Sequence, residues 1–317
     1  MRRILISVAL GCALVTLAGC SATTASMPKP SVPFANYVAL GDSFTAGPLI
    51  APQAEGAPAT CVRSGANYPS YLASYLRVRT FTDASCSSAE TSDLYASQSS
   101  RMGLRASPRT DTPAQLDAVK ATTDLVTLGI GGNDFSLFSD VIAQCVDRAS
   151  STPGKSPCRN SFTRDGVDLK MQDAKAVQAR IEKAIAAIVK RAPKARIVIV
   201  GYLRVLPGDG TCSAMPLRPV DANWTDSIER QINTSLSQAA KNSGATFVDS
   251  YALSKNHDAC AGKQAWINGD QTILFRAAAF HPFREGMDAV ARETYRTLTD
   301  MSPPKSPNVD RLARIPR

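Results

Sequence analysis

Residues that bind metals are scarce in this sequence. Its 317 residues include only two histidines, and none of its eight cysteines belongs to a C-x-x-C pair. Zinc and redox sites draw on these residue types, so both classes of protein are disfavoured. Aromatic residues make up only 6% of the chain. Although Trp224 and Trp266 are present, no aromatic platform for stacking on sugars is evident.

A strong excess of one charge is also missing from the part expected to fold. The formal net charge is +9, of which two charges come from Arg2 and Arg3. A further net +3 comes from the basic, proline-containing tail at 302–317, which leaves +4 for the rest of the chain. This mild excess gives no reason to expect nucleic-acid binding. Such a tail could contact anionic lipid, but is more often simply solvated.

Long apolar runs are absent after the first twenty residues. Arg2 and Arg3 precede the apolar stretch Ile4–Thr16, which is short for a membrane span and typical of a signal peptide. The tetrapeptide Leu-Ala-Gly-Cys that ends at Cys20 resembles a bacterial lipobox. We therefore expect residues 1–19 to be a signal peptide and Cys20 to carry a lipid anchor. The competing interpretation is an ordinary signal peptide that happens to contain a cysteine.

The next segment is rich in Ser, Thr and Pro, so residues 20–35 are expected to form a flexible tether. The folded domain is expected at 36–301. The protein should be exported and held at the outer face of the membrane, or secreted. We expect a monomer.

Six cysteines remain beyond the signal peptide and the predicted lipidation site. An even number in an exported chain favours disulfides, and six cysteines allow fifteen pairings. Sequential pairing fits best, because each pair would then bracket a local excursion of the chain. The pairs would be Cys61 with Cys86, Cys145 with Cys158, and Cys212 with Cys260.

Short apolar runs alternate with helical patterns from Tyr37 onward, which indicates an α/β protein with a parallel sheet covered on both faces. The expected strands are Tyr37–Leu40, Arg79–Phe81, Leu125–Leu128, Ile197–Val200 and Thr246–Val248. The expected helices are Tyr68–Leu76, Thr112–Ala121, Met171–Arg191, Ala222–Asn242 and Arg284–Met301. Regions 48–67 and 145–170 are expected to be loops. They either form the walls of a substrate cleft or are surface loops with no role in function. Sites in parallel sheets lie at the carboxyl ends of the strands.

Three of these strands run directly into polar, glycine-containing turns, and two of the turns carry residues suited to chemistry. The first reads GDSFTAG, in which Ser43 follows a strand and precedes a helix, so its hydroxyl would lie at the sheet edge. It is not the G-x-S-x-G elbow of α/β-hydrolases, because Thr45 takes the last glycine position. The second reads GIGGNDF, in which the Asn133 amide is a suitable oxyanion donor. Both turns also suit plain helix caps.

The third candidate is a histidine placed just before the last helix. His281 stands between Phe280 and Pro282, which would fix its position. A lone histidine is more often a packed or surface residue than a catalyst. His257 lies in a polar loop, so we expect a structural or solvent-exposed role for it.

Taken together, these blocks resemble the SGNH (GDSL-type) hydrolase family over roughly residues 36–300. GDSFTAG matches its first block, GGND its third, and FHP followed by Arg-Glu-Gly-Met its last; Asn67-Tyr68-Pro69 resembles the secreted actinobacterial-type members. The resemblance implies a flavodoxin-like three-layer α/β/α sandwich with a central parallel sheet. It implies Ser43 as nucleophile, His281 as base and Asn133 as an oxyanion donor beside the Ser43 backbone N–H. The six cysteines also resemble those of family esterases with three bridges.

Two departures from the family pattern stand out. Ser88 occupies the position of the glycine whose backbone N–H joins the oxyanion hole, and Ala278 replaces the aspartate expected three residues before the histidine. A Ser-His dyad is therefore expected, with the Ala278 carbonyl orienting the imidazole. Asp249 or Asp270 would be the alternative, if the fold brings either of them near the ring.

The activity implied by the resemblance is that of a serine esterase or lipase without a metal or cofactor. The expected substrate is a lipid ester or a small acyl ester. A carbohydrate O-acetyl esterase is an alternative. The missing aspartate motivates another alternative, a non-catalytic cell-envelope binding lipoprotein on the same fold.

Overall fold

The computed structural model describes residues 34–99, 112–151, 157–208, 210–308 and 312. The predicted signal peptide, Cys20 and most of the predicted tether lie outside the described residues. Residues 32–317 form a compact unit by themselves. In the described part of the chain, no helix combines the length and apolar character needed to cross a membrane.

A five-stranded parallel sheet forms the centre of the fold, in the order β2-β1-β3-β6-β7. The five expected strands are confirmed. They are β1 Asn36–Gly41, β2 Thr80–Asp83, β3 Leu125–Gly129, β6 Arg196–Val200 and β7 Thr246–Val248. Every residue of β3 is buried, which explains why this strand reads as a continuous apolar run rather than an alternating one.

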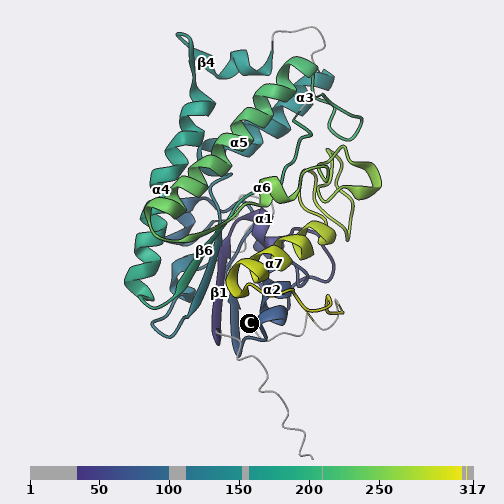
Figure 1. Cartoon of the computed structure of the whole chain (residues 1–317). Coiled ribbons are helices and arrows are strands. Elements are labelled where there is room, and N and C mark those ends of the chain that lie inside the picture. Colours follow the sequence, from purple (N-terminus) through teal and green to yellow (C-terminus); the bar gives the residue numbers. More distant parts are fainter. Residues whose placement is uncertain (1–33, 100–111, 152–156, 209, 309–311, 313–317) are drawn as a thin grey trace, which may run out of the picture. The chain divides into compact units, whose positions relative to one another are not determined.

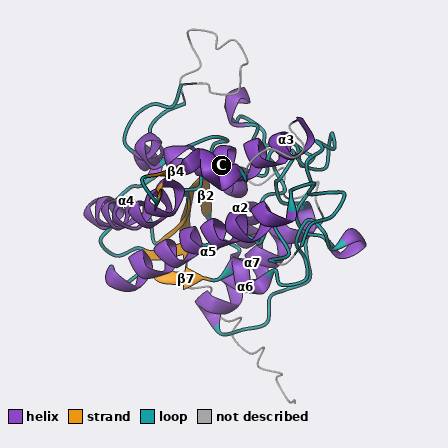
Figure 2. Cartoon of the chain, turned by 90° about the horizontal axis from the view of Figure 1, so that it is seen from above, coloured by secondary structure: helices purple, strands orange, loops and turns teal. Residues whose placement is uncertain are grey.

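Helices cover both faces of this sheet (Figure 1), as the α/β/α prediction requires. Helix α4 packs along α5, and α2 packs along α7. The helices are α1 Ser43–Ala46, α2 Tyr68–Leu76, α3 Gln144–Ser151, α4 Leu169–Arg191, α5 Pro219–Asn242, α6 Ser250–Leu253 and α7 Arg284–Thr299. The strands β4 Thr163–Arg164 and β5 Val167–Asp168 form a separate antiparallel pair. Figure 2 shows the helices around the sheet from above.

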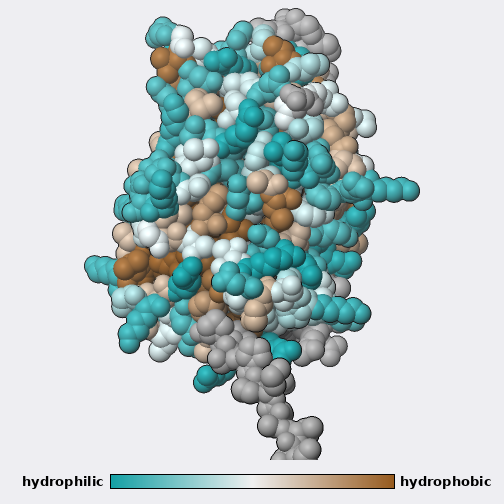
Figure 3. Space-filling model, viewed as in Figure 1, coloured by the Kyte–Doolittle hydropathy of each residue, from teal (hydrophilic) through white to brown (hydrophobic). Residues whose placement is uncertain are grey.

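The amphipathic pattern that predicted the helix at 171–191 is also the pattern of burial. Val177, Ile181, Ile185 and Ile188 are at most 1% exposed and face the core. Burial of each such side chain contributes about 1.5–3 kcal/mol to folding. Figure 3 shows hydrophilic residues over most of the face that it presents, with apolar residues gathered in several groups between them.

Two sequence predictions of local structure are wrong. The expected helix Thr112–Ala121 is only the 3-10 turn Gln115–Ala118. Pro113 restricts the start of this segment, and the Gln115 side chain leaves it to bond both the N–H and the carbonyl of Gly41. The expected loop at 145–170 begins as helix α3, which continues a π-helical turn at Ser139–Ala143.

The three disulfides follow the sequential pairing that the sequence favoured. The structure joins Cys61 to Cys86, Cys145 to Cys158, and Cys212 to Cys260. The second of these bonds ties the helix that follows the π-helical turn to the next loop.

The beginning of the predicted tail contacts the domain through hydrogen bonds, although several of its residues, such as Ser302 and Lys305, are exposed. Ser306 donates a hydrogen bond to the Asp288 carboxylate on α7, and Arg292 donates to the Pro304 carbonyl. Leu312 is fully buried. The basic residues at 311, 314 and 317 lie outside the described residues.

Candidate active site

The loops that follow β1, β2 and β3 meet at one edge of the sheet. Gly41 and Gly129, the last residues of two neighbouring strands, are paired in register. A Cβ on Gly41 would lie 2.6 Å from the Gly129 carbonyl oxygen and 2.2 Å from Thr45 Oγ1, so only glycine fits there. The Cys86 N–H donates to the Gly41 carbonyl and thereby holds the second loop against the first.

Ser43 is the first residue of α1, a single helical turn. The Asp42 side chain caps this turn by accepting a hydrogen bond from the Phe44 N–H at 2.9 Å. Ser43 itself is 8% exposed and lines a cavity. Its position is therefore set by the strand end before it and by the cap on the turn.

Asp42 belongs to a buried hydrogen-bond network that sequence analysis missed. Tyr202 lies after β6, in the turn to which no chemistry was assigned. Its hydroxyl donates to Asp42 Oδ2 and accepts from the Gly132 N–H at 2.6 Å. Burial raises the pKa of Asp42 to about 7, although these hydrogen bonds oppose the rise. Tyr202 thus joins the turn of Ser43 to the turn of Asn133, and no sequence motif indicated it.

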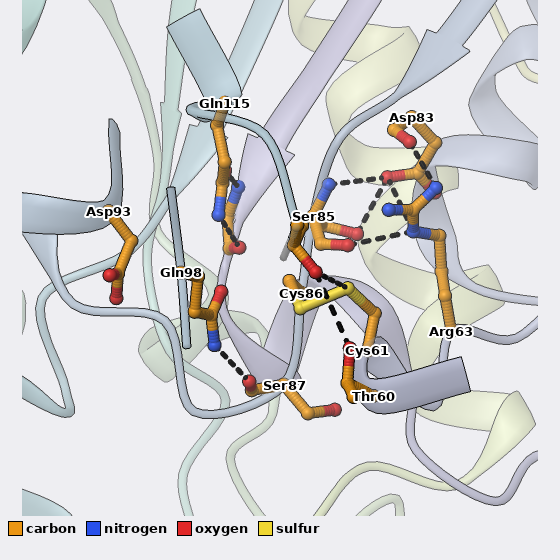
Figure 4. The surroundings of a disulfide bond; sticks show 12 residues. Thr60, Cys61, Arg63, Asp83, Ser85, Cys86, Ser87, Asp93, Gln98 and Gln115 are labelled. Carbon is orange, nitrogen blue, oxygen red and sulfur yellow. Dashed lines mark hydrogen bonds and ion pairs between the residues drawn. A yellow bond between two sulfur atoms is a disulfide. The ribbon is translucent and has the colours of Figure 1, made fainter. Parts of the chain in front are cut away.

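The segment before Ser88 is held by a disulfide and by buried polar side chains (Figure 4). The Cys61–Cys86 bond anchors it from one side, and Gln98 donates to the Ser87 carbonyl at 2.8 Å. The Arg63 guanidinium donates to the Ser85 carbonyl at 2.7 Å. Ser88 lines the same cavity as Ser43.

The backbone of Ser88 has a φ of +62°, a left-handed conformation that favours glycine. This explains why the family pattern places a glycine here, and shows that a serine can still adopt the required backbone. We expect Ser88→Gly to keep ester hydrolysis within about twofold of the parent and to stabilise the fold by about 1 kcal/mol, because the left-handed region costs a non-glycine residue about that much. Urea unfolding with an activity assay checks this. A large loss of activity would assign a role to the Ser88 side chain.

Asn133 is held in place by the loop on which Ser88 lies. Its Nδ2 donates to the Ala89 carbonyl at 3.0 Å, and Asn133 is one of the residues that line the cavity. The neighbouring Asp134 is fully buried and accepts two hydrogen bonds from Thr91, at 2.8 and 2.7 Å. Arg180 from α4 completes this junction with an ion pair to Asp134 at 3.0 Å. The second and third loops are therefore locked together beside the cavity.

His281 reaches the same cavity from the segment before α7. Its Nδ1 lies 2.6 Å from the Ala279 carbonyl oxygen. The Ala278 prediction is therefore wrong by one residue, because the Ala278 carbonyl instead accepts from the His281 N–H at 3.3 Å and from Asn268 Nδ2 at 3.0 Å. The positive φ of Phe280, +63°, turns the chain so that the ring faces Ala279.

The bond to Ala279 fixes the tautomer of the imidazole. A carbonyl oxygen can only accept, so Nδ1 carries the proton and Nε2 keeps its lone pair. The ring is part-buried beside Phe44, with their centroids 5.4 Å apart. Burial lowers the pKa of His281 below its usual 6.5, while the Ala279 carbonyl partly opposes this. The ring is therefore neutral at pH 7.

Neither carboxylate considered as a substitute partner holds this ring. Asp249 caps α6 and accepts from the Ala252 N–H, and among the described residues neither Asp249 nor Asp270 makes a hydrogen bond to His281. His257, the other histidine, stacks on Trp266 at 3.9 Å and does not line the cavity, as expected for a structural residue. Within the described ranges no three His, Cys, Asp or Glu side chains cluster in a way that could hold a metal.

The cavity has a volume of about 210 Å³ and combines the polar groups above with an apolar wall. Part of that wall comes from the π-helical turn and the residue before it. The lining residues are Ser43, Phe44, Pro48, Ser87, Ser88, Asn133, Phe138, Ser139, Ile142, Ala143, Ala278, Phe280 and His281. The structure thus brings together every residue that the sequence assigned to the reaction.

The sequence model of the GDSL-like lipase/acylhydrolase family matches residues 39–289. The chain belongs to this family. It is therefore an ester hydrolase, and the central parallel sheet with flanking helices is the SGNH fold that the sequence predicted. The matched range contains all three blocks on which the prediction depended.

Several relatives of this hydrolase come from Streptomyces. It is 32% identical to Lipase 2 of Streptomyces coelicolor over 94% of this chain and 97% of the relative. It is 31% identical to an esterase of Streptomyces scabiei over 90% of this chain and 91% of the relative. Among solved structures, phospholipase A1 of Streptomyces albidoflavus superimposes with a TM-score of 0.64 at 25% identity, over 84% of this chain and 99% of that one.

Proposed function

We propose that this hydrolase cleaves carboxylic esters with an apolar acyl part through an acyl-serine intermediate at Ser43. The observation that carries the proposal is the cavity itself. Ser43, Asn133 and His281 line it together with an apolar wall, which suits an acyl chain. Such a wall favours lipid or small acyl esters over an acetyl group on a polar sugar.

In the proposed mechanism, His281 Nε2 removes the proton of the Ser43 hydroxyl as its oxygen attacks the ester carbonyl. His281 then protonates the leaving alcohol, and water hydrolyses the acyl-serine by the reverse path. The Ala279 carbonyl replaces the usual carboxylate. It fixes the tautomer as a carboxylate would, but stabilises the imidazolium less because it carries no full charge.

The proposed oxyanion donors are the backbone N–H groups of Ser43 and Ser88 and the side chain of Asn133. An amide nitrogen carries two hydrogens. In Asn133 one of them is directed at the Ala89 carbonyl, which orients the group and leaves the second for the substrate oxygen. A donor of this kind contributes about 2.7–4 kcal/mol to the transition state.

The acyl preference follows from the wall of the cavity. We expect activity on nitrophenyl esters to rise with acyl chain length while added carbons fill the cavity, and then to level off or fall. A fluorophosphonate should label Ser43. Absence of labelling, with a folded protein, would contradict the enzymatic proposal and favour the binding lipoprotein. If a parallel assay showed that the enzyme prefers to remove acetyl groups from polysaccharide, the proposed preference for lipid or small acyl esters would be contradicted.

The pH dependence of kcat/KM tests whether the pKa of His281 is lowered. Because burial lowers the pKa of His281 below 6.5, most of the base is still unprotonated at pH 6.5, and the fall in kcat/KM that His281 causes should be centred below that pH. A carboxylate partner would raise the pKa and move this fall upward. An apparent pKa above 6.5 for kcat/KM that persists when Asp42 is replaced by Asn would contradict the proposal that a carbonyl holds the ring.

Asp42 titrates in the same region, since its pKa is about 7. It lies behind Ser43 and does not line the cavity. Asp42→Asn removes the titrating carboxyl but keeps a side chain that can cap the helix. The variant therefore distinguishes the titration of Asp42 from that of His281. A change in kcat/KM near pH 7 that disappears in this variant is caused by Asp42. The fall in kcat/KM that remains at lower pH is caused by His281.

We also propose that the chain is exported and anchored through Cys20. The three disulfides support an oxidising compartment. The segment ending in Leu-Ala-Gly-Cys supports lipidation, after which residues 20–35 would tether the domain to the membrane. Mass spectrometry of the N-terminal peptide from the native host tests this. An unmodified Cys20 would contradict it.

A further inference from the structure

One hairpin of the domain displays three consecutive large apolar side chains to solvent. Ile273, Leu274 and Phe275 are 39%, 67% and 78% exposed. The other exposed large apolar residues of the described chain, such as Val189 on α4 and Val220 on α5, stand singly on other elements. A run of this kind at one tip is unfavourable in water and marks a surface that is covered in use. The hairpin lies in the yellow-green loop region beside α7 in Figure 1.

The hairpin is held rigidly in this outward arrangement. Ile273 and Ala277 exchange two backbone hydrogen bonds of 3.0 Å. Asn268 Nδ2 donates to the carbonyls of Gln271, Ala277 and Ala278 and so closes the base. Phe275 has a φ of +64°, which is unfavourable for a bulky residue. The surrounding bonds thus maintain a strained tip instead of allowing Phe275 to fold back onto the protein.

The base of the same hairpin is part of the cavity wall. Ala278, Phe280 and His281 follow the tip directly and line the cavity. The Ala278 N–H donates to the carbonyl of Pro48, another lining residue, and the Phe275 carbonyl accepts from the Ala51 N–H. Whatever covers the tip is therefore brought to the site where the ester is bound.

The grooves beside the tip are more cationic than anionic. Phe275 shares one groove with Arg276 and Arg284, and a second groove next to it contains Lys263. Glu285 is the one carboxylate lining either groove among the described residues. Arg276 is held over the Phe283 ring at 4.7 Å. Apolar side chains flanked by cations fit a layer of acyl chains beneath anionic headgroups.

We propose that the hairpin Gln271–Ala279 docks the domain on an anionic phospholipid surface. Leu274 and Phe275 insert into the acyl layer while Arg276 contacts the headgroups, so that the cavity receives ester substrate from the lipid. The delivery of substrate rests on the proposed function, whereas docking itself does not depend on it.

Binding to vesicles tests the proposal on residues 32–317, a compact unit that lacks the predicted anchor. Ser43→Ala keeps the lipids intact during the measurement. On vesicles of phosphatidylcholine with phosphatidylglycerol, the double variant Leu274→Ser with Phe275→Ser should lose about tenfold to a hundredfold in affinity, because two large apolar side chains no longer insert. Arg276→Gln should lose about fivefold on these vesicles and nothing on phosphatidylcholine alone.

The matched control is Val189→Ser with Val220→Ser, which removes two exposed apolar side chains elsewhere. It should bind like the parent. Equal binding by the tip variant and the parent would overturn the proposal. So would an equal loss in the control, because the effect would then be one of general surface hydrophobicity.

Hydrolysis separates docking from chemistry. With Ser43 present, the tip variant should cleave a soluble short-chain nitrophenyl ester at the parent rate, which also shows that it is folded. Its release of fatty acid from vesicles should fall in parallel with binding. If no form cleaves the soluble ester, the proposed function fails, while the vesicle measurement still decides the docking.

Discussion

Ser43→Ala should lower kcat for ester hydrolysis by about 10⁴-fold or more and leave the fold intact. The expected size reflects the nucleophile acting as a unit with its base, so that removal of one disables both. In the part of the chain that the structure describes, the Ser43 side chain makes no hydrogen bond, and the cap of its turn is provided by Asp42. Nitrophenyl ester hydrolysis and thermal unfolding of parent and variant measure the two effects.

Ser139→Ala is the matched control for this experiment. Ser139 lines the same cavity, and its hydroxyl donates to the Ser136 carbonyl at 3.1 Å. Its removal should change activity by less than a few-fold. If Ser43→Ala kept its activity, or if Ser43→Ala and Ser139→Ala lost activity equally, the assignment of Ser43 as nucleophile would be contradicted.

His281→Gln should reduce kcat nearly as much as Ser43→Ala. Glutamine cannot accept the serine proton at neutral pH. The double variant should be no slower than either single variant, because the two residues act in one step and their effects do not add. Measurement of kcat for both single variants and the double variant tests this coupling directly.

The chain provides a natural control in its second histidine. His257 stacks on Trp266 and bonds the Gln264 carbonyl, so His257→Gln should affect stability slightly and kcat hardly at all. If His257→Gln removed activity and His281→Gln did not, the assignment of the base would be reversed. Strictly additive losses in the double variant would show that Ser43 and His281 do not act together.

A buried network beneath the site supports the serine and asparagine of the proposed reaction. Tyr202 joins Asp42 to Gly132, and Asp134 joins the Thr91 segment to Arg180. These buried bonds fix the loops that carry Ser43 and Asn133. Precise placement contributes to catalysis by keeping the reacting groups within reach of the substrate.

Much of the fold could be predicted because its physical causes are local. Buried parallel strands must be apolar on both faces, so Leu125–Leu128 and Ile197–Val200 were recognisable as strands. The helix at 171–191 shows its buried face in the spacing of its isoleucines. Thr112–Ala121 was predicted wrongly because the Gln115 side chain bonds distant Gly41, which no local pattern reveals.

The sequence by itself determined the five strands, most of the helices, the family and the candidate site residues, since each depends on short motifs or on periodicity. Only the tertiary structure decided which carbonyl holds His281, which tyrosine supports Asp42, and that Ile273–Phe275 stand out beside the cavity. These features depend on how distant segments approach one another and on single backbone angles. A hydrogen bond that changes partner by one residue, from Ala278 to Ala279, leaves no trace in the pattern of apolar and polar residues.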